Sequence, residues 1–308
     1  MAATGQLEGV IAPVVTPFGE DGTADAKRFV EQAQWLLEDG CTGLAPFGTT
    51  SEGNSLGLDE RMELLEELVD AGVDPAVLMP GTGTCSLSDT ITLTQHAVDI
   101  GCAGALVLPP FYYPNPTDDG LFRYFAELIE EVGDDGLALY LYHIPQMSGV
   151  GYSIDLIQRL RGEFPEVVAG LKDSSGDWSN MERILTEVPD FDLFPGSESY
   201  LLAGLKLGGA GVISAVANVN ARAMRRVFDN FESEDAETFQ ASVTAFRKTA
   251  QSYPLVQGMK ALIAHYRNDP VWADVRAPLL PMPENEIREM AARLARDHDF
   301  VLRFTATT

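Results

Sequence analysis

The chain has 308 residues, 45% of them apolar, which is ample for a sizeable core, and its formal net charge is −25, from 46 acidic and 21 basic residues. A surface of this charge repels nucleic acid and anionic lipid, so we expect neither as a partner. The acidic residues are dispersed and only five lysines occur, which indicates a solvated surface and also fits a salt-rich habitat.

Short apolar runs alternate with longer stretches of helical periodicity. The stretch DAKRFVEQAQWLLEDG, for example, places Phe29, Ala33, Leu36 and Leu37 on one face. Helical stretches that follow nearly continuous apolar strands indicate βα units and a parallel sheet. The runs that predict strands are residues 9–15, 42–47, 76–81, 103–109, 137–144, 167–171, 191–196 and 210–215.

The number of these units predicts the fold class. Eight units within about 215 residues match an α/β protein of the (β/α)8, or TIM barrel, type. An open doubly wound sheet usually carries a glycine-rich fingerprint after its first strand, and GVIAPVVTPFGEDG has none. After residue 218 the pattern is helical only. We therefore predict a catalytic barrel over residues 1–218 and a C-terminal helical extension over residues 219–308, packed on the barrel as one unit.

The cysteines and the N-terminus predict the compartment. Cys41, Cys85 and Cys102 are far apart and have no metal-type spacing, so we expect reduced thiols in a reducing compartment. The start MAATGQLEG has neither a basic segment nor an apolar core, and no apolar run approaches the ~20 residues of a membrane span. A cytoplasmic protein without a membrane partner is the expectation.

Polar residues follow several predicted strands at the end where chemistry gathers in a barrel of this type. Lys172 follows the apolar run 167–171 without a break. Hydroxyl groups and an aromatic pair are expected at the same face, because they follow other strands of the ring. They belong to Thr49, Thr50, Tyr142, Tyr112 and Tyr113.

These residue types suit imine chemistry. A lysine in a pocket of low polarity becomes a nucleophile toward carbonyls, and its imine acts as an electron sink. Tyr142 on a neighbouring strand suits proton transfer. Backbone N–H groups in the Gly48-Thr49-Thr50 turn can hold a carboxylate. We expect no metal, because His96, His143, His265 and His298 are scattered through the sequence.

Each feature alone has a simpler interpretation. Lys172 can reach solvent or pair with Asp173, and Tyr142 can fill the barrel. Lys172 can also act as a phosphate clamp, an alternative that the Gly208-Gly209 turn favours. The imine interpretation is preferred because the features lie on different strands of one predicted face.

Four motifs in this order resemble the dihydrodipicolinate synthase and N-acetylneuraminate lyase family of pyruvate-dependent class I aldolases. They are GTTSEG, YHIP, GLKDSSGD, and PGSES followed by GGAGVIS, and the resemblance covers nearly the whole chain. It implies Lys172 as the Schiff-base residue, Tyr142 as the proton-transfer tyrosine and Thr49 as a proton relay. It further implies that Thr49 and Thr50 bind the pyruvate carboxylate and that Gly196 and Ile213 line the pyruvate pocket.

The resemblance also implies an assembly and a covalent intermediate. Tyr112 or Tyr113 would cross into a neighbouring subunit to complete the proton relay, in a tetramer built from two dimers. The imine on Lys172 would need no cofactor.

One departure bears on the substrate. Relatives that make dihydrodipicolinate bind a carboxylate of the aldehyde substrate with an arginine shortly after the tyrosine, where this chain has Met147. A methionine cannot replace that charge-assisted contact. His143 in place of the usual asparagine is a second change.

The leading prediction is a Schiff-base lyase that forms or cleaves a 2-oxo acid through pyruvate, with a 2-keto-3-deoxy sugar acid as substrate. One alternative is dehydration of a keto-deoxy sugar acid through the same imine. Another is 4-hydroxy-tetrahydrodipicolinate synthase, which Met147 disfavours. The last is a 2-oxo acid binding protein without turnover.

Overall fold

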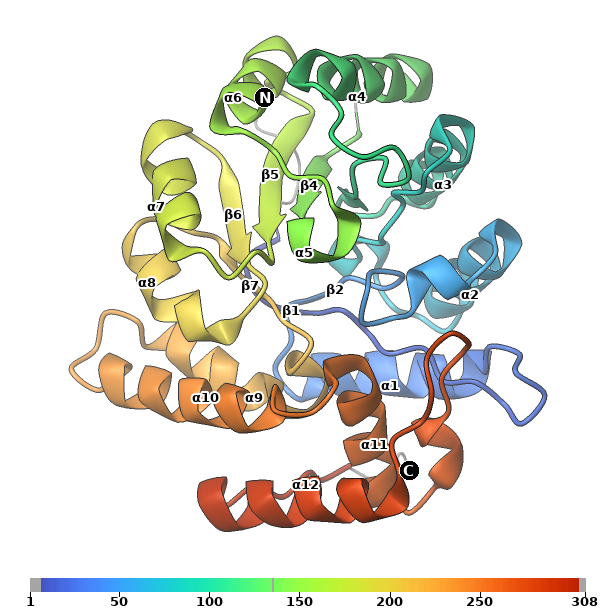
Figure 1. The fold of residues 1–308 in the computed structure, drawn as a ribbon, viewed down its shortest axis with the longest axis vertical. Helices are drawn as coiled ribbons and strands as arrows, with labels where there is room; N and C mark the ends of the chain where they lie inside the picture. The colour runs from blue at the N-terminus through green and yellow to red at the C-terminus, as the bar shows by residue number, and fades with distance from the viewer. Residues whose placement is uncertain (1–6, 135, 305–308) are drawn as a thin grey trace.

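The computed structural model describes residues 7–134 and 136–304, and over these residues it shows parallel strands at the centre of a ring of helices (Figure 1). Each strand pairs in parallel with its neighbours. The strands are β1 (Gly9–Ala12), β2 (Gly43–Leu44), β3 (Ala105–Val107), β4 (Leu139–His143), β5 (Val168–Asp173), β6 (Asp192–Pro195) and β7 (Gly211–Ile213).

The third predicted strand, residues 76–81, is wrong as a regular strand. Its start is a 3-10 helix, η2 (Pro75–Val77), and isolated bridges then join Leu78 to Leu44 and Gly81 to Leu106. Pro80 has no N–H to donate, so a regular ladder cannot run through this segment. The segment nevertheless takes the eighth place in the ring, between β2 and β3.

Backbone hydrogen bonds close this ring into a barrel. Met79 N donates to Leu44 O at 2.8 Å on one side, and Leu106 N donates to Pro80 O at 2.9 Å on the other. The two sheets, β2-β1-β7 and β3-β4-β5-β6, also meet where Ala210 N donates to Leu193 O at 3.1 Å. The predicted (β/α)8 barrel is therefore confirmed.

Several strands are shorter than predicted because prolines interrupt their ladders. β1 ends at Ala12 before Pro13, and β2 ends at Leu44 shortly before Pro46. β3 likewise ends at Val107, before Pro109. A proline lacks the N–H group that a ladder hydrogen bond needs, so the regular pairing stops there although the chain continues in an extended conformation.

Helices surround the barrel, and side-chain caps mark where many of them begin. Asp25, Ser86, Thr117, Ser153 and Asp177 each accept a hydrogen bond from a backbone N–H of the first helical turn. The helices are α1 (Ala26–Glu38), α2 (Leu58–Asp70), α3 (Leu87–Ile100), α4 (Asp118–Val132), α5 (Pro145–Ser148), α6 (Ile154–Glu163), α7 (Trp178–Glu187), α8 (Leu201–Lys206) and α9 (Ala217–Asp229), with the 3-10 helices η1 (Gly53–Ser55) and η3 (Glu198–Tyr200).

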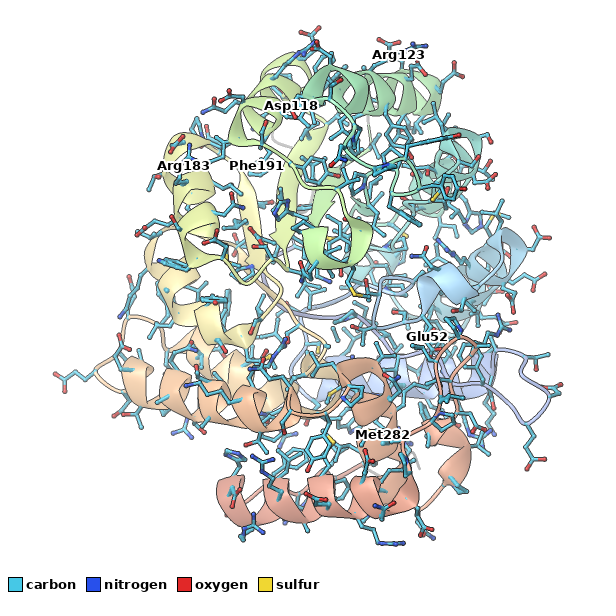
Figure 2. All side chains as sticks on the ribbon, viewed as in Figure 1. Glu52, Asp118, Arg123, Arg183, Phe191 and Met282 are labelled. Carbon is cyan, nitrogen blue, oxygen red and sulfur yellow. The ribbon has the colours of Figure 1, made fainter. Side chains whose placement is uncertain are left out.

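Charged side chains cover the outer helices. Asp118 and Arg123 of α4 and Arg183 of α7 lie on this outer surface (Figure 2). Arg183 pairs with Glu187 one helical turn away, at 2.8 Å. Exposed pairs of this kind contribute little to stability, so the outer surface mainly solvates the molecule.

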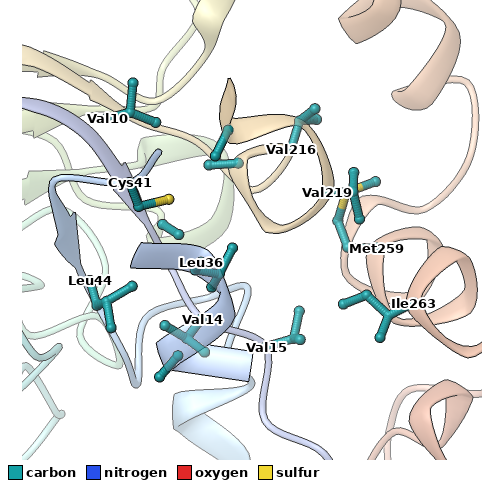
Figure 3. Packing of buried hydrophobic residues seen from close by; sticks show 14 of the residues in the cluster. Val10, Val14, Val15, Leu36, Cys41, Leu44, Val216, Val219, Met259 and Ile263 are labelled. Atoms are coloured by element: carbon teal, nitrogen blue, oxygen red, sulfur yellow. The ribbon is translucent and has the colours of Figure 1, made fainter. Parts of the chain in front are cut away.

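The C-terminal helices pack against one side of the barrel (Figure 1). They are α10 (Ala236–Ala250), α11 (Leu255–Arg267) and α12 (Glu284–His298), with η4 (Pro270–Ala273) between the last two. Met259 and Ile263 of α11 share one buried cluster with Val14, Val15 and Val219 (Figure 3). The predicted boundary between residues 218 and 219 falls inside α9.

Candidate active site

A cavity of about 770 Å³ lies at the C-terminal ends of the strands, where the sequence predicts the site. It combines the ends of β4 to β7 with the turn after β2 and with residues of α10 and α11. The predicted site residues that line it are Thr49, Thr50, Tyr142, Met147, Lys172, Gly196 and Ile213.

Lys172, the last residue but one of β5, lines this cavity. Only 4% of the residue is exposed, and its Nζ lies 4.3 Å from the centre of the Tyr142 ring. Within the described ranges it forms no ion pair. Asp173 is engaged elsewhere, because its Oδ1 accepts from Ser175 N at 2.7 Å and its Oδ2 accepts from Asn180 Nδ2 at 2.8 Å. Both simpler interpretations, a lysine in solvent and a lysine paired with Asp173, are therefore wrong.

Tyr142 lies beside Lys172, and its hydroxyl group contacts Thr49. Tyr142 and Lys172 are register partners on β4 and β5, so their side chains lie side by side. The Tyr142 Oη lies 3.2 Å from the Thr49 Oγ1, within hydrogen-bond distance. Tyr142 is itself buried. The arrangement suits movement of a proton between the lysine and the Thr49 hydroxyl.

The turn that carries Thr49 and Thr50 is tightly folded. Gly53 N donates to Gly48 O at 3.0 Å, and Glu52 N donates to Thr49 O at 3.1 Å. A Cβ at Gly53 would lie 1.9 Å from Phe47 O, so only glycine fits there. Within the part of the chain that the structure describes, the backbone N–H groups of Thr49 and Thr50 have no protein acceptor. Both are available to a carboxylate.

The opposite wall depends on a glycine. Gly196 N donates to Asp173 O at 2.6 Å, which brings the loop after β6 against the loop after β5. A Cβ at Gly196 would lie 2.1 Å from Ser174 Oγ, so a larger residue would push the two loops apart. Ile213, 1% exposed, supplies an apolar surface beside it.

His143 lies behind the cavity as a buried neutral side chain. Its Nδ1 accepts from Tyr152 N at 3.1 Å, which requires an unprotonated nitrogen. Burial lowers the pKa of His143, while the carboxylates of Asp173 and Asp177 act in the opposite direction without outweighing it.

This pKa predicts how stability depends on pH. Because the pKa of His143 is lower in the folded chain than its ordinary value near 6.5, the unfolded chain binds more protons below that pH. The free energy of unfolding should therefore fall as the pH drops below about 6.5, and this fall should be smaller in His143→Asn. Denaturant unfolding at several pH values measures it, with the exposed His265→Asn as the matched control. Equal pH dependence of wild type and His143→Asn would contradict the prediction.

Tyr112 and Tyr113 lie away from this cavity. Their residues are 76% and 74% exposed, and their rings contact each other edge to face with centres 5.4 Å apart. The single chain therefore does not bring the predicted pair to Tyr142. Met147, 67% exposed, lies at the cavity mouth on the short helix α5.

The phosphate-clamp alternative loses its supporting feature. The Gly208-Gly209 turn connects α8 to β7 and therefore precedes the strand, at the end opposite the cavity. No group of histidine, cysteine and acidic residues suited to a metal occurs within the described ranges.

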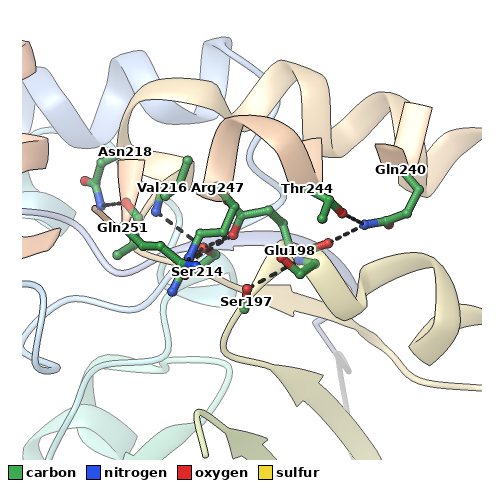
Figure 4. A network of polar contacts seen from close by, with 11 residues as sticks. Ser197, Glu198, Ser214, Val216, Asn218, Gln240, Thr244, Arg247 and Gln251 are labelled. Atoms are coloured by element: carbon green, nitrogen blue, oxygen red, sulfur yellow. Dashed lines mark hydrogen bonds and ion pairs between the residues drawn. The ribbon is translucent and has the colours of Figure 1, made fainter. Parts of the chain in front are cut away.

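Sequence reasoning missed the wall that α10 contributes. Arg247 Nη1 donates to Ser214 Oγ at 3.2 Å and pairs with Glu198 Oε2 at 3.3 Å (Figure 4). Glu198 is fully buried and also accepts from Ser214 Oγ at 2.6 Å. The signal in the sequence was Glu198, the acidic residue of PGSES, which follows a predicted strand. A buried carboxylate at such a position needs a cation as its partner.

The family model for the dihydrodipicolinate synthetase family matches residues 6–297. The chain belongs to this family. An uncharacterised DapA-like lyase of Chloroflexus aurantiacus is 33% identical over 94% of this chain and 96% of its own. Dihydrodipicolinate synthase from Agrobacterium tumefaciens is 33% identical, with a TM-score of 0.87 over 94% of this chain and 98% of its own.

A third relative has a ligand in its structure. YagE of E. coli K12, a prophage protein of the same family in complex with pyruvate, is 26% identical, with a TM-score of 0.84 over 94% of this chain and 98% of its own. Members of the dihydrodipicolinate synthetase family form a lysine Schiff base with pyruvate and use neither a metal nor a cofactor. The chain is thus a class I, Schiff-base lyase. Among the described residues no helix is long and apolar enough to cross a membrane.

Proposed function

We propose that this chain uses Lys172 to form an imine with pyruvate and thereby forms or cleaves a 2-keto-3-deoxy sugar acid. The observation that carries the proposal is the buried Lys172, free of any ion pair in the described chain, beside a Tyr142 within hydrogen-bond distance of Thr49. An amine in this position can reach a carbonyl carbon in the cavity, and a hydroxyl group lies next to it to exchange protons.

Imine formation uses three parts of the site. Lys172 Nζ adds to the 2-oxo carbon while backbone N–H groups of Thr49 and Thr50 hold the substrate carboxylate. The carbonyl oxygen then takes up protons, delivered through Tyr142, and leaves as water, so the carbon remains bound to nitrogen as an iminium. Donors fixed in advance for the carboxylate require no reorganisation when it binds.

Cleavage follows from the positive charge on the iminium. The C3–C4 bond breaks, its electron pair moves toward the iminium to give an enamine, and C4 becomes an aldehyde as its hydroxyl proton passes to Tyr142. Protonation of the enamine at C3 and addition of water release pyruvate and regenerate the amine. The Tyr142–Thr49 contact at 3.2 Å provides the route by which the proton leaves.

The remaining cavity supports a hydroxylated substrate. Four further polar residues line the cavity: Ser197, Ser199, Thr244 and Gln251. Met147 stands at the position where the sequence comparison within the family expects an arginine for the aldehyde's carboxylate, and its lack of charge there disfavours 4-hydroxy-tetrahydrodipicolinate synthase. The dehydratase alternative uses the same imine and differs only in breaking a C–O bond.

Assembly and location remain proposals of the same kind. Family members are typically oligomeric, and the exposed Tyr112–Tyr113 pair supports a dimer or tetramer in which one of these rings completes a partner's site. The free thiols of Cys41, Cys85 and Cys102 support a cytoplasmic location.

Product analysis separates these functions. The chain is incubated with a 2-keto-3-deoxy sugar acid, and we expect equimolar pyruvate and aldehyde by NMR. A dehydrated 2-oxo acid without pyruvate would establish the dehydratase instead. Consumption of pyruvate only with an aldehyde that bears both an amino group and a carboxylate, with formation of a nitrogen-containing ring, would favour the synthase. No turnover with any of these compounds would contradict the proposal.

A further inference from the structure

The cavity carries positive charge in a chain whose net charge is −25. Lys172, Arg247 and Lys248 line it, against a single lining carboxylate, Asp173, among the described residues. Asp173 is already held by Ser175 and Asn180. Pyruvate needs only Lys172 and the threonine turn, so the two cations of α10 have no role in the mechanism above.

Lys248 differs from Lys206 and Lys260, which both pair with a carboxylate. Lys206 pairs with Glu237 at 2.6 Å, and Lys260 pairs with Glu52 inside the molecule. Lys248 is exposed at the cavity, and no carboxylate of the described chain lies within ion-pair distance of it. In a chain with 46 acidic residues, its charge is left available to a ligand.

Arg247 is fixed in place and still has a free edge. Its Nη1 contacts Glu198 and Ser214, and its Nε donates to Gln251 Oε1 at 3.2 Å. Its Nη2 has no hydrogen-bond acceptor among the described residues and is accessible to solvent. The buried Glu198 holds one side of the guanidinium in place. The other side can therefore bind a ligand with little further loss of side-chain rotational freedom.

We infer that Arg247 and Lys248 form a subsite for an anionic group at the far end of the substrate. Resting on the proposed function, this narrows the substrate class to a 2-keto-3-deoxy sugar acid with a terminal carboxylate or phosphate. One end of the substrate is then held by amides of the threonine turn and the other by two cations, with hydroxyl groups of the cavity wall between them. Charge-assisted hydrogen bonds of this kind are the strong ones in recognition.

Three substrates that differ only in the terminal group test the inference. The group is a neutral hydroxymethyl, a carboxylate or a phosphate ester. We expect kcat/KM for one of the charged compounds to exceed that for the neutral compound by at least about tenfold. The favoured charged compound also decides between the carboxylate and the phosphate.

Variants at position 248 locate the effect. Lys248→Gln should lower kcat/KM for the favoured charged compound about tenfold. It should leave kcat/KM for the neutral compound unchanged. Lys248→Arg should restore most of it, and Lys27→Gln, which removes an exposed lysine on α1, should have no effect. Equal kcat/KM for all three compounds, or an equal loss for all three in Lys248→Gln, would overturn the inference.

A binding measurement keeps this result separate from the proposed function. Dissociation constants of the three compounds are measured by calorimetry on Lys172→Ala, which cannot turn them over. Equal constants overturn the subsite even if no compound is cleaved. Failure of the proposed function shows instead as absence of a borohydride-trapped pyruvate adduct in the wild type.

Discussion

Replacing Lys172 with alanine is expected to lower kcat/KM by at least about 10⁴-fold, because the variant lacks the atom that forms the imine. Lys248, the other lysine at the cavity, is exposed and lies on α10 at its edge, so it cannot take the place of Lys172. Initial rates of pyruvate release measure the loss.

The fold should survive this substitution. Lys172 forms no ion pair in the described chain, so its removal leaves no buried carboxylate without a partner. We expect the thermal unfolding midpoint to stay close to that of the wild type. Lys206→Ala, at an exposed pair, is the control and should keep full activity. Activity of Lys172→Ala within tenfold of the wild type would contradict the assignment of the imine to Lys172.

The Lys260→Met variant is expected to lose about 3–5 kcal/mol of folding free energy. Lys260 is fully buried on α11, and its Nζ lies 2.7 Å from Glu52 Oε1, whose side chain is 1% exposed. Burial lowers the pKa of Lys260, while Glu52 acts in the opposite direction. Without Lys260, the hydrogen bond from Arg276 N at 2.8 Å is the one that the Glu52 carboxylate keeps among the described residues. Urea unfolding measures the loss.

This pair also connects the C-terminal helices to the active site. Glu52 lies where the barrel meets the C-terminal part of the chain (Figure 2). It belongs to the turn of Thr49 and Thr50 and has a left-handed backbone, with φ of 55°. If the pair holds this turn in shape, folded Lys260→Met should also show a higher KM for pyruvate.

Two further variants serve as controls for Lys260. Lys206→Met breaks an exposed pair with Glu237 and should cost less than about 1 kcal/mol. Glu52→Gln combined with Lys260→Met removes both charges and should recover part of the lost stability. An unfolding midpoint of Lys260→Met equal to that of the wild type would contradict the role of the pair.

The residues on the strand ends could be predicted because a parallel barrel places all such ends on one face. Lys172, Tyr142, Thr49 and Ile213 follow or end apolar runs that the sequence displays directly. The irregular pairing of segment 76–81 could not be predicted, because the segment joins β2 and β3 through isolated bridges only. Apolar composition alone does not separate such a segment from a regular strand.

The residues that α10 and α11 bring to the site lie far along the chain from their partners. Glu52 and Lys260 are 208 positions apart, and Arg247 is 49 positions from Glu198. No local pattern connects them, because the contact exists only after the helices pack against the barrel. Tyr112 and Tyr113 are exposed on the single chain, and the place of one of them in a neighbouring subunit's site stays a prediction.

The most direct test of the central claim is borohydride reduction in the presence of pyruvate, followed by intact mass and peptide mapping. We expect the wild type to gain the mass of one reduced pyruvate adduct, located on Lys172, and Lys172→Ala to gain none. An unmodified wild type under conditions in which it is active, or an adduct located on another lysine, would contradict the mechanism derived from this site.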